Sequence, residues 1–123
     1  MRPLADDVPA DSALWSVRMA DSTLARYPVS RMRWHYEDGF LMHAVAQVGQ
    51  RTGQPRYGQA VLEYVDRFVQ EDGSIATYWL ADYNLDQIAP GRLLFPLHEA
   101  GGDARFGQAI ALLREQLARQ PRT

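Results

Sequence analysis

The stretch from residue 82 to residue 91, Asp-Tyr-Asn-Leu-Asp-Gln-Ile-Ala-Pro-Gly, places two carboxylates, a phenol and an amide before a predicted helix. Such groups exchange hydrogen bonds with sugar hydroxyls, and a carboxylic acid can also transfer a proton. We therefore interpret this stretch as the edge of a sugar-binding site, with Asp86 as a candidate site residue and Asn84 as a substrate-binding one. From the bare sequence, the more ordinary interpretation of Asp86 is a cap on the following helix. Asp82 fits a turn.

A second cluster lies in a polar and aromatic loop, where Trp34 and Tyr36 flank His35. Aromatic faces suit the apolar faces of sugar rings, and a tyrosine hydroxyl adds a polar contact. Trp34 and Tyr36 are therefore substrate-binding candidates, although the same rings could simply pack the loop onto the next helix. Arg31 and Arg33 could meet a uronate, or could be ordinary surface arginines.

The sequence contains no motif that is typical of a metal site, a phosphate-binding loop or a catalytic nucleophile. The three histidines, at 35, 43 and 98, lack the spacing of metal ligands. There is no glycine-rich phosphate loop after a strand, no Gly-x-Ser-x-Gly turn and no cysteine. We expect no metal and no cofactor.

The composition is that of one folded domain, residues 1–123, with an irregular segment at residues 1–10. Apolar residues make up 46% of the 123 positions and the formal net charge is -2. This balance gives no electrostatic grip on nucleic acid or on a membrane surface. No segment has the length and hydrophobicity of a signal peptide or a membrane span. The sequence therefore predicts a soluble, cytoplasmic protein.

Apolar residues recur at helical spacing along most of the chain. We predict helices over 11–26, 39–51, 55–70, 89–101 and 103–119, the second capped by Asp38. Pro96 should kink the fourth helix or cost it a hydrogen bond. Residues 74–80 are predicted to form a short strand. The residues expected in the core include Tyr78, Trp79, Phe106, Ile110, Leu113 and Leu117.

The segment 53–60 is repeated as 102–109, with five of eight positions identical and an offset of 49 residues. A period near 50 residues with two helices per unit indicates stacked antiparallel helical hairpins, in an open solenoid or a closed α/α toroid. Two units cannot cover their own concave side. We therefore expect exposed apolar surface, and either self-association or a longer parent polypeptide.

Several motifs resemble those of one known family. They are Arg18-Met19-Ala20-Asp21-Ser22, Trp34-x-Tyr36-x-x-Gly39, Thr52-Gly53-x-x-x-Tyr57, Tyr64-Val65-Asp66-x-Phe68-Val69-x-x-Asp72-Gly73, Tyr83-Asn84-Leu85-Asp86-x-Ile88-x-Pro90-Gly91 and Gln120-Pro121-Arg122-Thr123. In order and spacing, from about residue 12 to 123, they resemble the unsaturated glycuronyl and rhamnogalacturonyl hydrolases of glycoside hydrolase family 105, related to family 88. The resemblance implies an all-α fold, the N-terminal portion of an (α/α)6 toroid.

The resemblance also implies a reaction and a substrate. The family removes the 4,5-unsaturated uronic acid from lyase-generated pectic oligosaccharides, by hydrating the enol ether rather than displacing at the anomeric carbon. Asp86 matches the family's second site aspartate, so the resemblance implies a catalytic role for Asp86. The main acid/base aspartate of the family lies in a Trp-x-Asp-Gly-x-Tyr-Met segment beyond Pro-Arg-Thr, and this sequence stops at Thr123. Gln54 and Gly101 also depart from the family pattern. We therefore expect the chain alone to be weakly active or inactive.

A non-catalytic binding or scaffolding module is the second hypothesis. Stacked helical hairpins can present a concave surface to a ligand without doing chemistry. The carboxylate at 86 favours the hydrolase, because a peptide scaffold does not need an acid there.

Overall fold

The computed structural model describes residues 10–101 and 103–121, with side chains from residue 15 onward. The predicted irregular segment at 1–10 falls almost wholly outside the described residues. The α-helices are α1 (Ala10–Arg26), α2 (Tyr36–Thr52), α3 (Pro55–Phe68), α4 (Leu94–Gly101) and α5 (Ala104–Arg119). The 3-10 turns are η2 (Val29–Arg31), η3 (Leu80–Asp82), η4 (Leu85–Gln87) and η5 (Ala89–Leu93).

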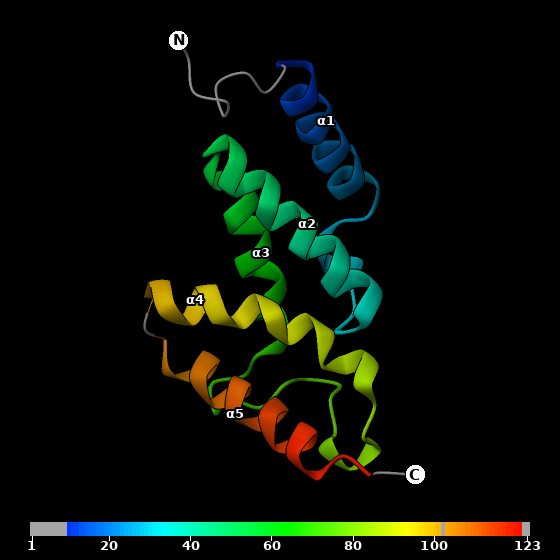
Figure 1. The fold of residues 1–123 in the computed structure, drawn as a ribbon, viewed down its shortest axis with the longest axis vertical. Coiled ribbons are helices and arrows are strands. Elements are labelled where there is room, and N and C mark those ends of the chain that lie inside the picture. The colour runs from blue at the N-terminus through cyan, green and yellow to red at the C-terminus, as the bar shows by residue number, and fades with distance from the viewer. Residues whose placement is uncertain (1–9, 102, 122–123) are drawn as a thin grey trace.

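Helical hairpins organise the molecule. In Figure 1, α1, α2 and α3 occupy the upper part, and α4 lies over α5 in the lower part. α2 packs against α1, α3 and η5, while α4 packs against α5. No strand occurs in the described ranges, so the prediction of an all-α chain of stacked hairpins is confirmed. No helix among the described residues is long and apolar enough to cross a bilayer.

The turn between α2 and α3 follows directly from its sequence. Gly53 ends α2 with φ of 69°, a left-handed conformation that suits glycine, and its N–H donates to the Gly49 carbonyl at 2.9 Å. Pro55 then occupies the start of α3, where its missing N–H costs nothing. Because the linker is this short, α3 turns back from the end of α2 and packs against it.

The core is aromatic where α2, α3 and the preceding loop meet. Trp34 and Tyr64 are each almost fully buried and stack with ring centroids 5.9 Å apart and an interplanar angle of 11°. Phe68 packs against both rings. This cluster fixes the loop at 32–35 onto α3, and so fixes the start of α2.

The predicted strand over 74–80 is wrong. Only one antiparallel bridge forms, between Val69 and Ile75, and the chain turns away at Thr77, whose φ is 65°. A strand needs a neighbour to pair with, and none of the described segments supplies one. Tyr78 is buried as predicted, but Trp79 is 65% exposed rather than in the core.

Three helix predictions also need correction. α2 begins at Tyr36 and is capped by His35, whose Nδ1 accepts from the Glu37 N–H at 3.5 Å, so Asp38 is not the cap. The fourth helix is divided into η5 and α4, and Pro96 lies in the first turn of α4, where no helical hydrogen bond is lost. Leu117, predicted to face inward, is 51% exposed.

Candidate active site

The loop that carries His35 is held by hydrogen bonds to its backbone. Asp38 is buried and accepts two of them, from the Arg33 N–H at 2.7 Å and from the Tyr27 hydroxyl at 3.1 Å. The Tyr64 hydroxyl donates to the Arg33 carbonyl at 2.7 Å. Burial strongly raises the pKa of Tyr64, which keeps the phenol protonated and able to donate. The loop is therefore positioned rigidly.

Trp34 joins this loop to the one that carries Asp86. Its indole Nε1 donates to the Gln87 carbonyl at 2.8 Å, across 53 positions of sequence. The side chain is 1% exposed. The prediction that Trp34 offers a face to a sugar does not match this burial, because a covered ring has no free face. Trp34 instead sets the distance between the two loops.

Asp86 lies on the surface beside His35. Its side chain is 62% exposed, and its Oδ2 is 3.8 Å from Nε2 of His35, which is 31% exposed. The Asp86 N–H donates to Oδ1 of Asn84 at 3.0 Å, so Asn84 is the residue that caps η4. The helix that begins at Ala89, η5, has Ile88 at its N-cap position and no side-chain cap, so the interpretation of Asp86 as a helix cap is wrong.

The backbone before Asp86 is unusual. Tyr83 has φ of 48°, an uncommon conformation for a residue with a side chain, and its carbonyl accepts from Nε2 of Gln120 at 3.0 Å. Residues held in such conformations cluster at functional sites. Gln120, at the end of α5, therefore holds this loop at Tyr83, while Trp34, just before α2, holds it at Gln87.

Two exposed aromatic rings follow on the next turns of α2. Tyr36 is 51% exposed and Phe40 is 66% exposed, and their ring centroids are 6.3 Å apart. Spacing of three or four residues puts side chains on one helical face, so the stripe continues to His43 and Gln47. The His43 Nε2 and Gln47 Nε2 atoms are 3.5 Å apart, within hydrogen-bond reach if the imidazole nitrogen is the acceptor.

A groove of about 630 Å³ adjoins the far end of this stripe. α2 contributes His43 and Gln47 to its lining, and η5 and α4 contribute Arg92 and Phe95. The groove does not include Asp86 or Tyr36. The polar pair at residues 35 and 86 and this groove therefore lie at opposite ends of one face of α2.

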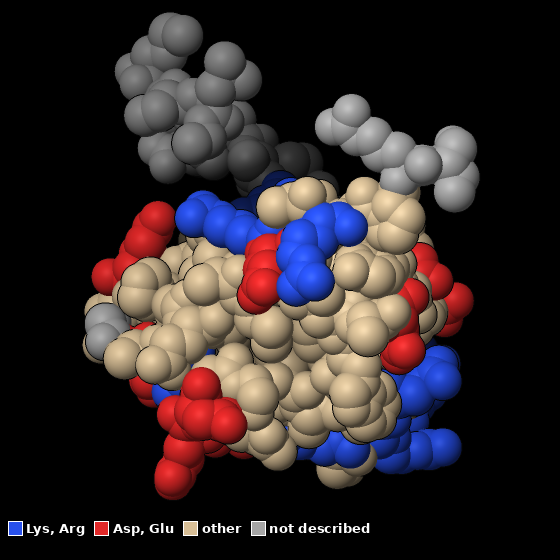
Figure 2. All heavy atoms as spheres, turned by 90° about the horizontal axis from the view of Figure 1, so that it is seen from below, with Lys and Arg blue, Asp and Glu red and all other residues tan. Residues whose placement is uncertain are grey.

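The chemistry open to this arrangement is that of sugar recognition. Carboxylate, imidazole and amide groups exchange hydrogen bonds with hydroxyls, and exposed rings stack on pyranose faces. No group of three His, Asp or Glu side chains that could hold a metal ion occurs in the part of the chain that the structure describes. Acidic and basic side chains lie close together around a mainly uncharged centre on the face shown in Figure 2.

Of the predicted site residues, the structure places Asp86 beside His35 and puts Asn84 in the same turn as Asp86, while Tyr36 follows His35 at the start of α2 and is exposed. Arg31 and Arg33 are both exposed. Sequence reasoning missed His35 as a neighbour of Asp86 and missed Phe40 altogether. The spacing of Tyr36 and Phe40, i and i+4 on a helix, was the available signal for Phe40.

Comparison with known proteins also points to a protein that acts on carbohydrates. Residues 15–123 match a family model described as Glycosyl Hydrolase Family 88. A solved structure, a glycoside hydrolase of family 105 from C. acetobutylicum ATCC 824, matches with a TM-score of 0.81 and 33% sequence identity. The match covers 89% of this chain and 30% of that protein, so this chain spans less than a third of its relative.

The helical hairpins, and their match to a helical toroid enzyme, place the chain among the glycoside hydrolases. More narrowly, the chain belongs to glycosyl hydrolase family 88.

Proposed function

We propose that this chain supplies the part of a glycoside hydrolase site that binds the terminal sugar of an oligosaccharide ending in a 4,5-unsaturated uronic acid. The observation that carries the proposal is the pair formed by Asp86 and His35, 3.8 Å apart and both accessible. Two elements far apart in sequence meet there, and Trp34 links them through the Gln87 carbonyl. Two charged residues that met on the surface by chance would need no such hydrogen bond between their loops.

The roles we assign follow from chemistry and place. Asp86 accepts hydrogen bonds from sugar hydroxyls, and His35 orients its carboxylate. Tyr36 stacks on the ring and contributes its hydroxyl. Asn84 uses its side-chain oxygen in the turn before Asp86, which leaves its amide nitrogen to donate to the substrate. Phe40 extends the stacking surface along α2.

The reaction of the whole enzyme is a hydration. C4 of the unsaturated uronic acid takes a proton, C5 takes the hydroxyl of water, and the resulting hemiketal opens with release of the next sugar. Acid or base assistance of this kind contributes about 10²–10⁴-fold to a rate. We assign Asp86 to this assistance as a catalytic residue. Pectic oligosaccharides are the substrates that fit the family resemblance.

Binding tests the proposal without requiring turnover. A disaccharide ending in the unsaturated uronic acid is titrated into the full chain and followed by ligand-observed NMR. We expect Asp86→Asn to weaken binding about two- to tenfold, the effect of one net hydrogen bond. Asp82→Asn is the matched control, because Asp82 is also exposed and lies in the same loop.

Equal affinity in the wild type and the Asp86→Asn variant, or equal losses in both variants, contradicts the proposal and favours the scaffolding alternative. The saturated disaccharide serves as a second control, because it lacks the planar enol ether. Loss of the ultraviolet absorbance of the enol ether measures any turnover by the chain itself.

A further inference from the structure

Three successive side-chain hydrogen bonds lead from the core to the loop that carries Asp86. The Tyr78 hydroxyl donates to Oε1 of Gln116 at 2.5 Å. Nε2 of Gln116 donates to Oε1 of Gln120 at 3.1 Å, and Nε2 of Gln120 donates to the Tyr83 carbonyl at 3.0 Å. We call the side chains of Tyr78, Gln116 and Gln120 the amide relay.

The relay begins where water is excluded. Gln116 is fully buried and Tyr78 is 7% exposed. A buried carboxamide needs a partner for its oxygen and for its nitrogen, because an unpaired buried polar group costs free energy. Burial also raises the pKa of Tyr78, so the phenol stays protonated and can donate. An apolar side chain of the same size would serve packing alone, so the hydrogen bonds of Gln116 point to a further role.

The order of donors and acceptors is fixed from the loop end. A carbonyl oxygen can only accept, so Gln120 must turn its nitrogen toward Tyr83. The oxygen of Gln120 then faces Gln116, which must present its own nitrogen there and its oxygen to the hydroxyl of Tyr78. If Gln116 turned over, Gln120 would have to turn over as well, and the Tyr83 carbonyl would lose its donor.

Both ends of the last hydrogen bond are set by the local backbone. Pro121 follows Gln120, and a residue before proline favours an extended conformation, as the Gln120 φ of -56° and ψ of 127° show. The side chain of Gln120 therefore leaves the end of α5 instead of continuing the helix. Tyr83 ends η3 with φ of 48°, a conformation that persists only where the surroundings support it.

The loop is thus held by a backbone carbonyl on each side of Asp86. Gln120 holds it at Tyr83, and Trp34 holds it at Gln87. Trp34 is already part of the site described above. The relay supplies the second support, and it does so from α5.

We propose that Gln116 and Gln120 are positioning residues for Asp86. Gln116 sets the direction of the Gln120 carboxamide, and Gln120 holds the Tyr83 carbonyl and so the backbone that leads to Asp86. The inference rests on the proposed function in one respect, that Asp86 contacts the sugar. The geometry of the loop does not depend on a ligand.

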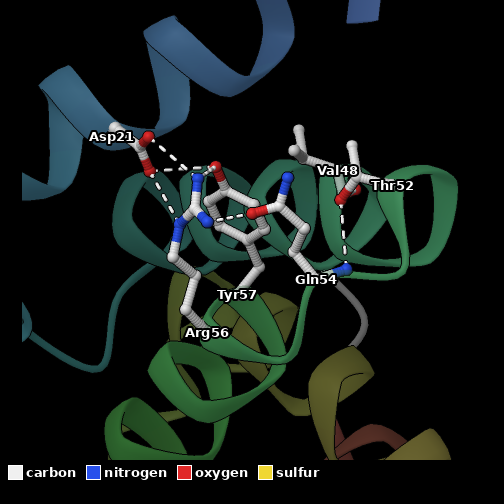
Figure 3. Close-up of polar contacts among 6 residues, drawn as sticks. All are labelled: Asp21, Val48, Thr52, Gln54, Arg56 and Tyr57. Carbon is white, nitrogen blue, oxygen red and sulfur yellow. Dashed lines mark hydrogen bonds and ion pairs between the residues drawn. The ribbon is translucent and has the colours of Figure 1, made fainter.

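A second side-chain network provides a matched control. In Figure 3, Arg56 and Tyr57 of α3 point toward Asp21 of α1. Arg56 donates to both carboxylate oxygens, at 3.2 Å from Nε and 3.0 Å from Nη2, and the Tyr57 hydroxyl donates at 2.9 Å. Tyr57 is fully buried, as Gln116 is. Because this network joins α3 to α1, Tyr57→Phe removes a hydrogen bond that does not support the loop.

The test uses the full chain, labelled with ¹³C and ¹⁵N and free of ligand. Gln120→Met removes the last donor directly and gives the Tyr83 carbonyl shift without its hydrogen bond. Gln116→Met should move that shift in the same direction and by no more than Gln120→Met does. The amides of residues 84–87 should shift with it. Tyr57→Phe should leave all of these shifts unchanged.

A charge change at Gln116 tests the direction of the relay. In Gln116→Glu the ionised carboxylate can only accept, so Gln120 turns its nitrogen away from Tyr83, whereas the protonated acid can donate to Gln120. The Tyr83 shift of this variant should therefore approach the wild-type value as the pH is lowered, and that of Gln116→Met should not. Wild-type spectra over the same pH range are subtracted, because Glu115 acts on Tyr78.

The inference is overturned if Gln120→Met leaves the Tyr83 carbonyl and Asp86 amide shifts unchanged, or if Gln116→Met changes them no more than Tyr57→Phe does. Titration with the disaccharide ending in the unsaturated uronic acid separates it from the proposed function. Gln120→Met should weaken binding by no more than Asp86→Asn does, and affinity equal to that of the wild type would count against positioning. Altered shifts in the variants with no binding by the wild type would contradict the proposed function alone.

Discussion

Replacing Trp34 with phenylalanine should destabilise the chain and loosen its candidate site together. The substitution removes the Nε1 donor, so the partly buried Gln87 carbonyl loses its partner at 2.8 Å. An unsatisfied buried polar group costs about 1–3 kcal/mol. The smaller ring also leaves space beside Tyr64 and Phe68, at a cost of about 1 kcal/mol if the core relaxes partly. The expected loss of unfolding free energy is therefore about 2–4 kcal/mol.

Urea unfolding followed by circular dichroism at the helical band measures this loss. Trp79→Phe is the matched control, because Trp79 is 65% exposed, and it should change the free energy by no more than about 0.5 kcal/mol. The reasoning is refuted if Trp34→Phe and Trp79→Phe have the same effect. In a variant lacking Trp15 and Trp79, the emission of the remaining Trp34 should be blue-shifted until the chain unfolds, because the ring is buried.

Two further predictions concern acid sensitivity and helix packing. Because hydrogen bonds from Arg56 lower the folded-state pKa of Asp21 below 3.8, its stabilisation is complete above that value and is lost as the pH falls through the lower, folded one. Urea midpoints measured from pH 7 to pH 2 should therefore fall less steeply below about pH 4 in Asp21→Asn than in the wild type, and equal slopes would contradict this. Gly39→Ala should cost about 1–3 kcal/mol, since its Cβ would lie 2.8 Å from the Pro90 Cα. Gly58→Ala, which meets open space inside α3, should be neutral or stabilising by thermal unfolding, and a loss as large as that of Gly39→Ala would count against the packing argument.

Local signals in the sequence were sufficient for most helices. The periodic apolar stripe of α3, the Gly53 and Pro55 turn and the Asp103 cap each act within a few residues, so their consequences can be predicted without knowing the rest of the fold. The start of α2 could not be predicted this way. Asp38 looks like a cap, but its partners are Arg33 and Tyr27, and the latter lies eleven residues away.

The strand prediction failed for a related reason. Alternating aromatic and β-branched residues favour a strand only when another strand is available to pair with. Here the chain beyond Ile75 turns at Thr77 and enters η3 instead. Leu117 was placed inward from its helical spacing, but its side chain is 51% exposed.

The candidate site could be predicted only in part. The Tyr-Asn-Leu-Asp stretch makes Asp86 and Asn84 candidates, but it gives no sign of the neighbour of Asp86, since His35 lies 51 positions earlier. Trp34 was given a role at the surface because tryptophan suits sugars. Its burial depends on Tyr64 and Phe68, which only the folded chain brings to it.

We propose that a sugar binds where His35 and Asp86 meet. Amide shift mapping of the ¹⁵N-labelled full chain, titrated with the disaccharide ending in a 4,5-unsaturated uronic acid, tests it most directly. We expect the largest shifts at residues 35–40 and 84–87. Shifts confined to other surfaces, or no saturable shift at millimolar ligand, would contradict it.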